Sequence, residues 1–113
     1  MTIRIEELRF EAVIGLLDFE REQEQTVVVD LELDYDYETG AYLDYASIAE
    51  EVITHIRQKR YELLEEALLG LERLLGSRHP EIRRFDCRIT KPHILPHARV
   101  SVRHRVSYDP SST

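Results

Sequence analysis

The clearest hydrophobic pattern in the chain is a strict alternation over residues 27–37. Apolar or aromatic residues occupy the odd positions, and most of the even positions are acidic. This period of two is typical of a β-strand with one buried face and one solvated face. It predicts an antiparallel sheet that is covered on one side only, because parallel sheets are usually covered on both sides. Thr39 and Gly40 are expected to end the strand.

A first strand is predicted over residues 3–14, before Gly15. Its apolar residues alternate in one parity up to Ile5 and in the other parity from Leu8 onward. One extra residue in a strand produces such a change of phase, so a β-bulge is expected between these two positions, at Glu6-Glu7.

Two more strands are predicted near the C-terminus, over residues 85–91 and 100–108. Cys87 lies in phase with the apolar residues of its strand, so we interpret it as a small core residue and not as a nucleophile. The acidic segment 16–25, between the first two strands, is too long for a tight hairpin and is predicted to be a loop.

Two segments in the middle of the chain show the helical spacing of apolar residues. The first has its apolar stripe within residues 48–56. Two starting points are possible for this helix. Asp44 can cap it, or Ser47 and Glu50 can form a capping box.

The second helical segment opens at residues 60–65 and contains a first candidate for chemistry. It is expected to end near Gly76-Ser77, because Pro80 cannot continue a helix. Glu65 lies roughly 100° around the helix from Leu64, at the edge of the apolar stripe. We therefore expect a carboxylate that is held rigid and half-buried. The alternative is an ordinary solvated glutamate with a favourable position relative to the helix dipole.

The predicted order is strand, strand, helix, helix, strand, strand. It indicates an α+β fold, with a four-stranded antiparallel sheet and two helices packed on one face. Residues 1–108 are predicted to form a single domain, and residues 109–113 a disordered tail. Since both edges of so small a sheet are open, pairing between subunits is expected.

Composition and net charge argue against several classes of function. The 113 residues are 42% hydrophobic and 33% charged, as in a folded globular domain. The net charge of −7 argues against a nucleic-acid partner and against an anionic membrane surface. No apolar run approaches the roughly 20 residues of a membrane helix, and the N-terminus does not resemble a signal peptide. A single cysteine is consistent with the reducing cytoplasm.

Lys91 is the second candidate for chemistry. It is in phase with Ile89, so its side chain is expected to point toward the helix layer, where loss of hydration would lower a lysine pKa. The alternative is a surface lysine at a strand end. His93 and His97 do not predict a metal site, because the prolines around them exclude a helix and no set of Cys and His ligands is present. His104, among apolar residues, is expected to be a core histidine with its hydrogen bonds satisfied.

Four short motifs in this order resemble dihydroneopterin aldolase, an enzyme of the tunnelling-fold group that acts on pterins and purines. They are Gly15 to Glu20, Asp44-Tyr45, Leu63-Leu64-Glu65 and Thr90-Lys91-Pro92. The resemblance covers residues 2–108.

The resemblance implies a role for each matching residue. Glu65 would bind the 2-amino and ring N–H edge of the pterin, and Leu64 would contribute backbone groups beside it. Glu20 would hold the hydroxylated side chain of the substrate, and Tyr45 and Lys91 would handle protons. The resemblance also implies a homotetramer or homo-octamer with sites shared between subunits, and neither a metal nor another cofactor.

The reaction implied is that of folate biosynthesis, in which 7,8-dihydroneopterin is cleaved to 6-hydroxymethyl-7,8-dihydropterin and glycolaldehyde. This retro-aldol cleavage would need neither a metal nor a Schiff base, because the pterin ring takes up the electrons. The chain departs from the family in a shorter segment before Tyr45 and in residues 93–97, where a turn of small residues is more usual.

Two alternatives remain open at this point. The related epimerase acts on dihydroneopterin triphosphate, but that substrate calls for cations near its tail, whereas the segment 16–25 is acidic. The second alternative is a non-catalytic pterin-binding or assembly protein that keeps the fold.

Overall fold

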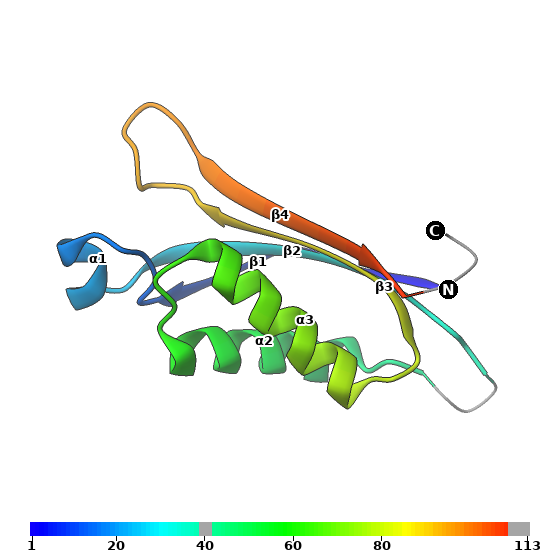
Figure 1. The fold of residues 1–113 in the computed structure, drawn as a ribbon. Helices are drawn as coiled ribbons and strands as arrows, with labels where there is room; N and C mark the ends of the chain where they lie inside the picture. The colour runs from blue at the N-terminus through cyan, green and yellow to red at the C-terminus, as the bar shows by residue number, and fades with distance from the viewer. Residues whose placement is uncertain (39–41, 109–113) are drawn as a thin grey trace.

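Four strands form one antiparallel sheet in the order β1-β2-β3-β4, and two long helices cover one of its faces (Figure 1). The computed structural model describes residues 1–38 and 42–108. The elements are β1 (Thr2–Ala12), α1 (Asp18–Glu22), β2 (Gln25–Tyr35), α2 (Tyr45–Lys59), α3 (Leu64–Arg78), β3 (Ile82–Lys91) and β4 (Val100–Ser107). The predicted α+β fold is therefore confirmed, whereas the predicted break at Thr39 and Gly40 and the tail 109–113 lie outside the described residues.

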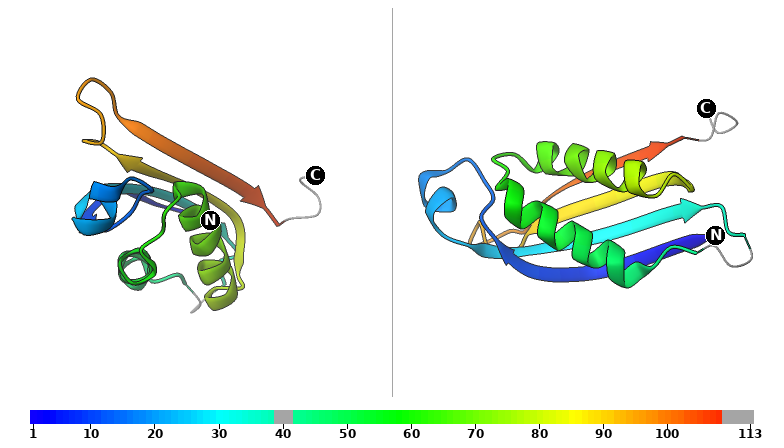
Figure 2. Two further views of the ribbon diagram at one scale, coloured as in Figure 1. Left: turned by 60° about the vertical axis from the view of Figure 1, so that its left-hand side comes forward. Right: turned by 90° about the horizontal axis from the view of Figure 1, so that it is seen from below.

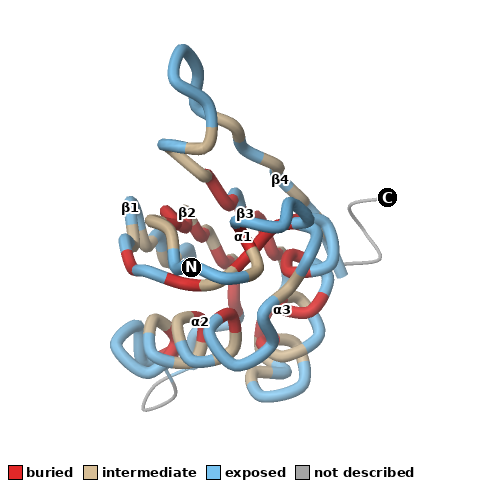
Figure 3. The backbone as a smooth tube through the Cα atoms, turned by 90° about the vertical axis from the view of Figure 1, so that its left-hand side faces the viewer, coloured by how far each residue is buried: buried red, intermediate tan, exposed pale blue. Residues whose placement is uncertain are grey.

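The core lies between the sheet and the paired helices α2 and α3, which cross the same face (Figure 2). The buried stretches of the sheet and the inward sides of the helices meet there (Figure 3). The fully buried side chains include Val27, Val29, Leu33, Ile48, Val52, Ile56, Leu68, Leu71, Leu75, Phe85, Cys87 and Ile89. Burial of one such large apolar side chain contributes about 1.5–3 kcal/mol, so this layer is the main source of stability.

The predicted β-bulge in β1 is confirmed. The register with β2 shifts between Ile5 and Leu8, and Glu7 has a positive φ of 55°. The backbone N–H of Glu7 donates to Oδ1 of Asp30 at 2.9 Å, which satisfies a donor that the disrupted ladder leaves unpaired.

The ends of the helices settle one alternative and correct one prediction. Asp44 caps α2 by accepting hydrogen bonds from the N–H groups of Ala46 and Ser47, so a capping box that starts at Ser47 is wrong. The second helix does not open at Arg60, because Arg60 is left-handed and ends α2. Residues 60–63 are a connection, and α3 ends at Arg78, close to the predicted end at Gly76-Ser77 and before Pro80.

The segment 16–25 is not only a loop, because it contains the five-residue helix α1. Glu20 stabilises the helix start, where its Oε1 accepts a hydrogen bond from the N–H of Leu17 at 3.2 Å. None of the helices in residues 1–38 and 42–108 has the length and apolar character that a membrane crossing requires.

Candidate active site

A buried ion pair joins α1 to the end of β3. The Nζ atom of Lys91 lies 2.8 Å from Oε2 of Glu20. Glu20 is only 3% exposed, and the side chain of Lys91 is 12% exposed. The two elements meet at the same end of the sheet (Figure 1). Lys91 is therefore not a surface lysine, and the prediction of a partly dehydrated side chain is confirmed.

The Glu20 carboxylate is held by three donors. Besides Lys91, Nε2 of Gln25 donates to Oε2 at 2.8 Å, and the N–H of Leu17 donates to Oε1. Burial raises the pKa of Glu20, but the hydrogen bonds from Lys91, Gln25 and Leu17 outweigh it and keep the pKa below its usual value. Glu20 is thus an anion at neutral pH with a fixed orientation.

Gly15 makes room for this carboxylate. Its φ is +127°, a region that L side chains rarely adopt, and a Cβ placed there would fall on the carboxylate of Glu20. Only glycine lets the backbone lie this close to the buried anion. The hydrophobic pattern predicts Gly15 only as the end of the first strand, and this close approach to Glu20 is not predictable from it.

The start of α3 belongs to the same end of the molecule. The N–H of Gly15 donates to the carbonyl of Tyr61 at 3.0 Å, so the connection 60–63 is tied to the segment next to Glu20. The hydroxyl of Tyr61 also lies 2.7 Å from Nε2 of His55, which fixes this connection to α2. The first turn of α3 follows directly.

Leu64 and Glu65 form that first turn, and they differ in burial. The side chain of Leu64 is buried in the core, whereas Glu65 is exposed. The expectation of a half-buried Glu65 is therefore wrong for the single chain. The preceding residue, Leu63, gives no side-chain cap to the first N–H groups of α3. These N–H groups and the positive end of the helix dipole suit an acceptor, while the carboxylate of Glu65 suits a donor.

Tyr45 is not close to the other predicted site residues in the single chain. It is the first residue of α2 and is 69% exposed. The 15 residues of α2 span about 20 Å, and α3 begins only after that helix ends. Figure 1 accordingly shows the start of α2 toward the opposite end of the sheet from α1.

The other acidic residues of the segment 16–25 do not share the environment of Glu20. Asp18, Glu22 and Glu24 are exposed, and only Glu20 is buried. The only signal for this choice was the family resemblance, through the motif Gly15 to Glu20. The sequence offered no signal for Gln25, whose side chain also donates to the carbonyl of Ile14 at 2.8 Å.

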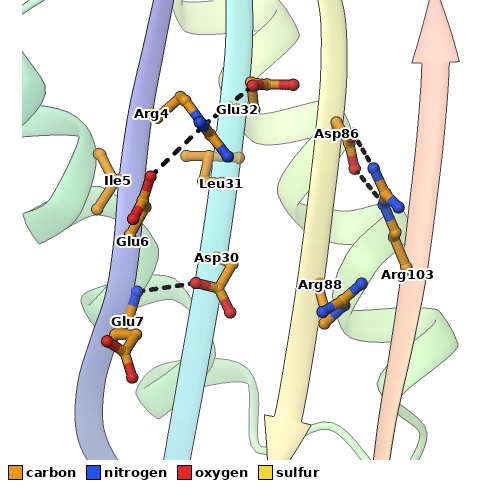
Figure 4. A pocket seen from close by; sticks show the side chains of 10 residues that line it. All are labelled: Arg4, Ile5, Glu6, Glu7, Asp30, Leu31, Glu32, Asp86, Arg88 and Arg103. Atoms are coloured by element: carbon orange, nitrogen blue, oxygen red, sulfur yellow. Dashed lines mark hydrogen bonds and ion pairs between the residues drawn. The ribbon is translucent and has the colours of Figure 1, made fainter.

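The helix-free face of the sheet contains a second candidate site, a hollow of about 490 Å³ (Figure 4). Its charged residues are largely paired across strands. Arg103 binds Asp86 through two contacts of 2.7 and 2.9 Å, and Arg4 lies 3.1 Å from Glu32. None of the predicted site residues lines this hollow, so the end with Glu20 and Lys91 is the stronger candidate.

Cysteine and histidine take structural positions. Cys87 is buried, as predicted, and burial raises the pKa of its thiol, so it is a poor nucleophile at neutral pH. His104 is only half-buried, and its Nε2 lies 2.6 Å from Oε1 of Glu72. The expectation of a core histidine is thus wrong on burial, although the side chain has a partner. Across the described ranges, no group of three or more metal-ligating side chains occurs.

Two groups of residues with different chemistry lie at this end of the sheet, the pair Glu20 and Lys91 and the first turn of α3. A carboxylate and an ammonium group in contact can orient a hydroxyl group and exchange a proton with it. The uncapped turn of α3, with its own carboxylate, can bind a planar heterocycle that presents adjacent donors and acceptors.

Comparisons with known proteins agree with this arrangement. A sequence model described as "FolB: Dihydroneopterin aldolase" matches residues 3–105. No match was found among curated proteins. The structure of FolB from Vibrio cholerae is 30% identical, with a TM-score of 0.86, and the match covers 95% of this chain and 97% of that one.

Two further structures have the same fold. E. coli dihydroneopterin aldolase in complex with neopterin is 28% identical with a TM-score of 0.86, and the match covers 95% of this chain and 99% of that one. Dihydroneopterin aldolase from Burkholderia thailendensis, bound to guanine, is 18% identical with a TM-score of 0.78. That match covers 96% of this chain and 92% of the other, and at this identity it supports the fold alone.

Proposed function

The chain belongs to the dihydroneopterin aldolase family, and we propose that it is a carbon–carbon lyase that cleaves 7,8-dihydroneopterin. Its fold is the tunnelling fold of that family. The observation that carries the proposal is the buried contact between Glu20 and Lys91 beside the first turn of α3. The same end of the sheet thus holds groups for a heterocycle and groups for proton transfer.

Glu65 is proposed to bind the pterin ring. The ring presents two adjacent N–H donors, the 2-amino group and a ring N–H, and one carboxylate can accept both. The first-turn N–H groups of α3, beginning with that of Leu64, are proposed to bind acceptor atoms beside that edge. The neopterin complex of the E. coli relative supports a pterin as the ligand class.

The proposed reaction breaks the bond between the two hydroxylated carbons nearest the ring. A base removes the hydroxyl proton of the second carbon, which leaves as the aldehyde carbon of glycolaldehyde. The bonding electrons pass to the first carbon and into the ring. Protonation of the first carbon gives 6-hydroxymethyl-7,8-dihydropterin, so atoms and charge balance without an external oxidant or metal.

Lys91 and Tyr45 are proposed to handle these protons. Glu20 accepts a hydrogen bond from Lys91, so it can orient the amino group of Lys91 toward a hydroxyl of the substrate. Glu20 is also proposed to bind the hydroxylated side chain of the substrate. Tyr45 is too far along α2 to act in its own chain, so a second copy must supply it to the site. We therefore propose a homotetramer or homo-octamer with shared sites, in which the open edges of β1 and β4 pair.

The epimerase that acts on dihydroneopterin triphosphate is the second candidate function. It fits less well, because the exposed residues around Glu20 include Asp18, Glu22 and Glu24, and these would repel a triphosphate. A non-catalytic pterin-binding protein is the third, and the burial of the pair Glu20 and Lys91 favours an enzyme over it. The cytoplasmic location inferred from composition stays a prediction.

Incubation with 7,8-dihydroneopterin, followed by chromatography of the products, distinguishes the three candidate functions. The aldolase should release 6-hydroxymethyl-7,8-dihydropterin and glycolaldehyde in equal amounts. An epimerase should give an isomer of the substrate, and should act on the triphosphate when that is offered instead. Recovery of unchanged substrate by a protein that still binds neopterin would overturn the enzymatic proposal.

A further inference from the structure

Arg21 follows Glu20 in α1, and its guanidinium group binds only backbone carbonyls. Nη1 donates to the carbonyl of Gly15 at 3.1 Å and to that of Tyr61 at 3.2 Å, and Nη2 donates to the carbonyl of Arg60 at 2.9 Å. Within the described part of the chain, no carboxylate pairs with Arg21. A half-buried cation devoted to three carbonyls is a structural clamp between segments.

The clamp joins two distant parts of the chain. Residues 15–21 lie on one side, and the connection that leads into α3 lies on the other, about 40 positions later. Two further bonds reinforce it. The N–H of Gly15 donates to the carbonyl of Tyr61 at 3.0 Å, and Nη2 of Arg60 donates to the carbonyl of Arg21 at 3.3 Å.

Each side of the clamp touches one half of the site. Gly15 lies against the carboxylate of Glu20, which holds Lys91. The connection on the other side continues directly into the turn with Leu64 and Glu65. The position of one half relative to the other therefore depends on the bonds that meet at Arg21.

We propose that Arg21 is a positioning residue for the aldolase reaction. It sets the spacing between the proton-transfer pair, Glu20 and Lys91, and the turn that binds the pterin. This inference rests on the proposed function. Arginine suits the task because its rigid planar fork can reach three carbonyls at once, whereas lysine offers a flexible point charge.

The kinetic test compares Arg21→Ala and Arg21→Lys with wild type. Each half of the site stays intact in these variants, so the Kd for neopterin should change less than about threefold. The kcat for 7,8-dihydroneopterin should fall roughly 10- to 100-fold in Arg21→Ala, because a displacement of about 1 Å costs on that order in rate. The kcat of Arg21→Lys should lie between those of wild type and Arg21→Ala. Guanidinium ions at low concentration should partly restore the kcat of Arg21→Ala.

Arg57→Ala is the matched control. Arg57 also binds a backbone carbonyl of another element, since its Nε donates to the carbonyl of Glu11 at 3.0 Å, and its guanidinium lies 5.8 Å from the ring centre of Phe10. Among the described residues, no hydrogen bond or ion pair joins Arg57 to Gly15 or to the connection 60–63. The kcat of Arg57→Ala should equal that of wild type, even where its melting temperature falls as much as that of Arg21→Ala.

Hydrogen exchange provides a readout that does not require activity. The amide of Gly15 should exchange at least about tenfold faster in Arg21→Ala, while an amide of the central sheet such as that of Leu31 should keep its rate. Unchanged exchange at Gly15, or a kcat within about twofold of wild type, would overturn the proposal for Arg21. A wild-type protein without aldolase activity would instead overturn the proposed function, and the exchange result would still report whether Arg21 holds the segments together.

Discussion

At the scale of single residues, a substitution of Lys91 distinguishes a catalytic role of this residue from a purely structural one. Lys91→Ala should reduce turnover of 7,8-dihydroneopterin by about 10²–10⁴-fold, the usual contribution of a general acid–base group. The variant also leaves the buried Glu20 without its cation, so some stability should be lost. Turnover should therefore be measured together with the melting temperature and with the affinity for neopterin.

The chain contains a matched control for that experiment. Lys59 is the only other lysine, and it is exposed in the last turn of α2. Lys59→Ala should keep full turnover. A folded Lys91→Ala protein with wild-type activity would exclude the proposed role of Lys91.

Glu65 can be tested through binding alone. Glu65→Gln replaces an acceptor of two charge-assisted hydrogen bonds by a group with one acceptor and one donor. We expect a loss of about 2–4 kcal/mol in the binding free energy of neopterin, measured by fluorescence titration. The neighbouring Glu66→Gln, in the same exposed turn, should bind as wild type does. Equal affinities for the two variants would remove Glu65 from the site.

At the scale of elements, the pairing of β3 with β4 predicts a pH dependence of stability. Asp86 is buried, and the hydrogen bond from Arg103 lowers its pKa although burial raises it. A carboxyl whose pKa is lower in the folded state stabilises the protein above its ordinary pKa. That contribution is lost as the pH falls through the folded-state value.

Asp86→Asn should therefore be less stable than wild type at pH 7, by about 1.5–3 kcal/mol for a hydrogen bond between charged groups. The two proteins should converge in unfolding free energy as the pH falls below about 4. Urea unfolding at a series of pH values measures this. In Arg103→Gln the loss of stability at low pH should be smaller than in wild type, but Arg84, whose Nη1 lies 3.5 Å from Oδ2 of Asp86, should retain part of it. Parallel profiles for wild type and Asp86→Asn would contradict the assignment.

The elements also show why some of the structure was predictable from the sequence. The alternation in β2 and the change of phase in β1 are local patterns, and they predicted a strand and a bulge correctly. The helix α1 has only five residues and no apolar period of its own. It is stabilised by Glu20, whose partner Lys91 is 71 positions away, and no local pattern encodes that contact.

The residues of the candidate site also differ in how far local patterns predict them. Lys91 could be predicted to point inward because strand parity fixes its direction, and Glu20 could be proposed only by resemblance to the family. The contacts of Gly15 and Arg21 with the connection 60–63 come from tertiary packing. The exposure of Glu65 could not be predicted either, because the amphipathic pattern places it at the edge of the apolar stripe, where the pattern alone does not decide burial.

At the scale of the whole molecule, shared sites can be tested by mixing two defective variants. Lys91→Ala should not cleave the substrate, and Tyr45→Phe should yield other pterin products. When the two are mixed and assembled randomly in a ring, about one site in four combines an intact Lys91 with an intact Tyr45 from the neighbouring copy. Formation of 6-hydroxymethyl-7,8-dihydropterin should then recover to about a quarter of the wild-type rate.

A mixture of Lys91→Ala with Glu65→Gln is the control. Both residues come from the same chain in the proposed site, so every site in this mixture carries one of the two defects. No recovery is expected. Recovery in the control, or its absence in the first mixture, would contradict the assignment of Tyr45 to the neighbouring copy, as would a monomer in sedimentation at micromolar concentration.

The single cysteine makes the opening of the core chemically visible. Cys87 is free and fully buried in β3, one of the two central strands, so an alkylating reagent can reach its sulfur only when the helices and sheet separate. The labelling rate therefore measures how often the molecule opens, without any added probe. If subunit association stabilises the fold, labelling should become slower as the protein concentration rises.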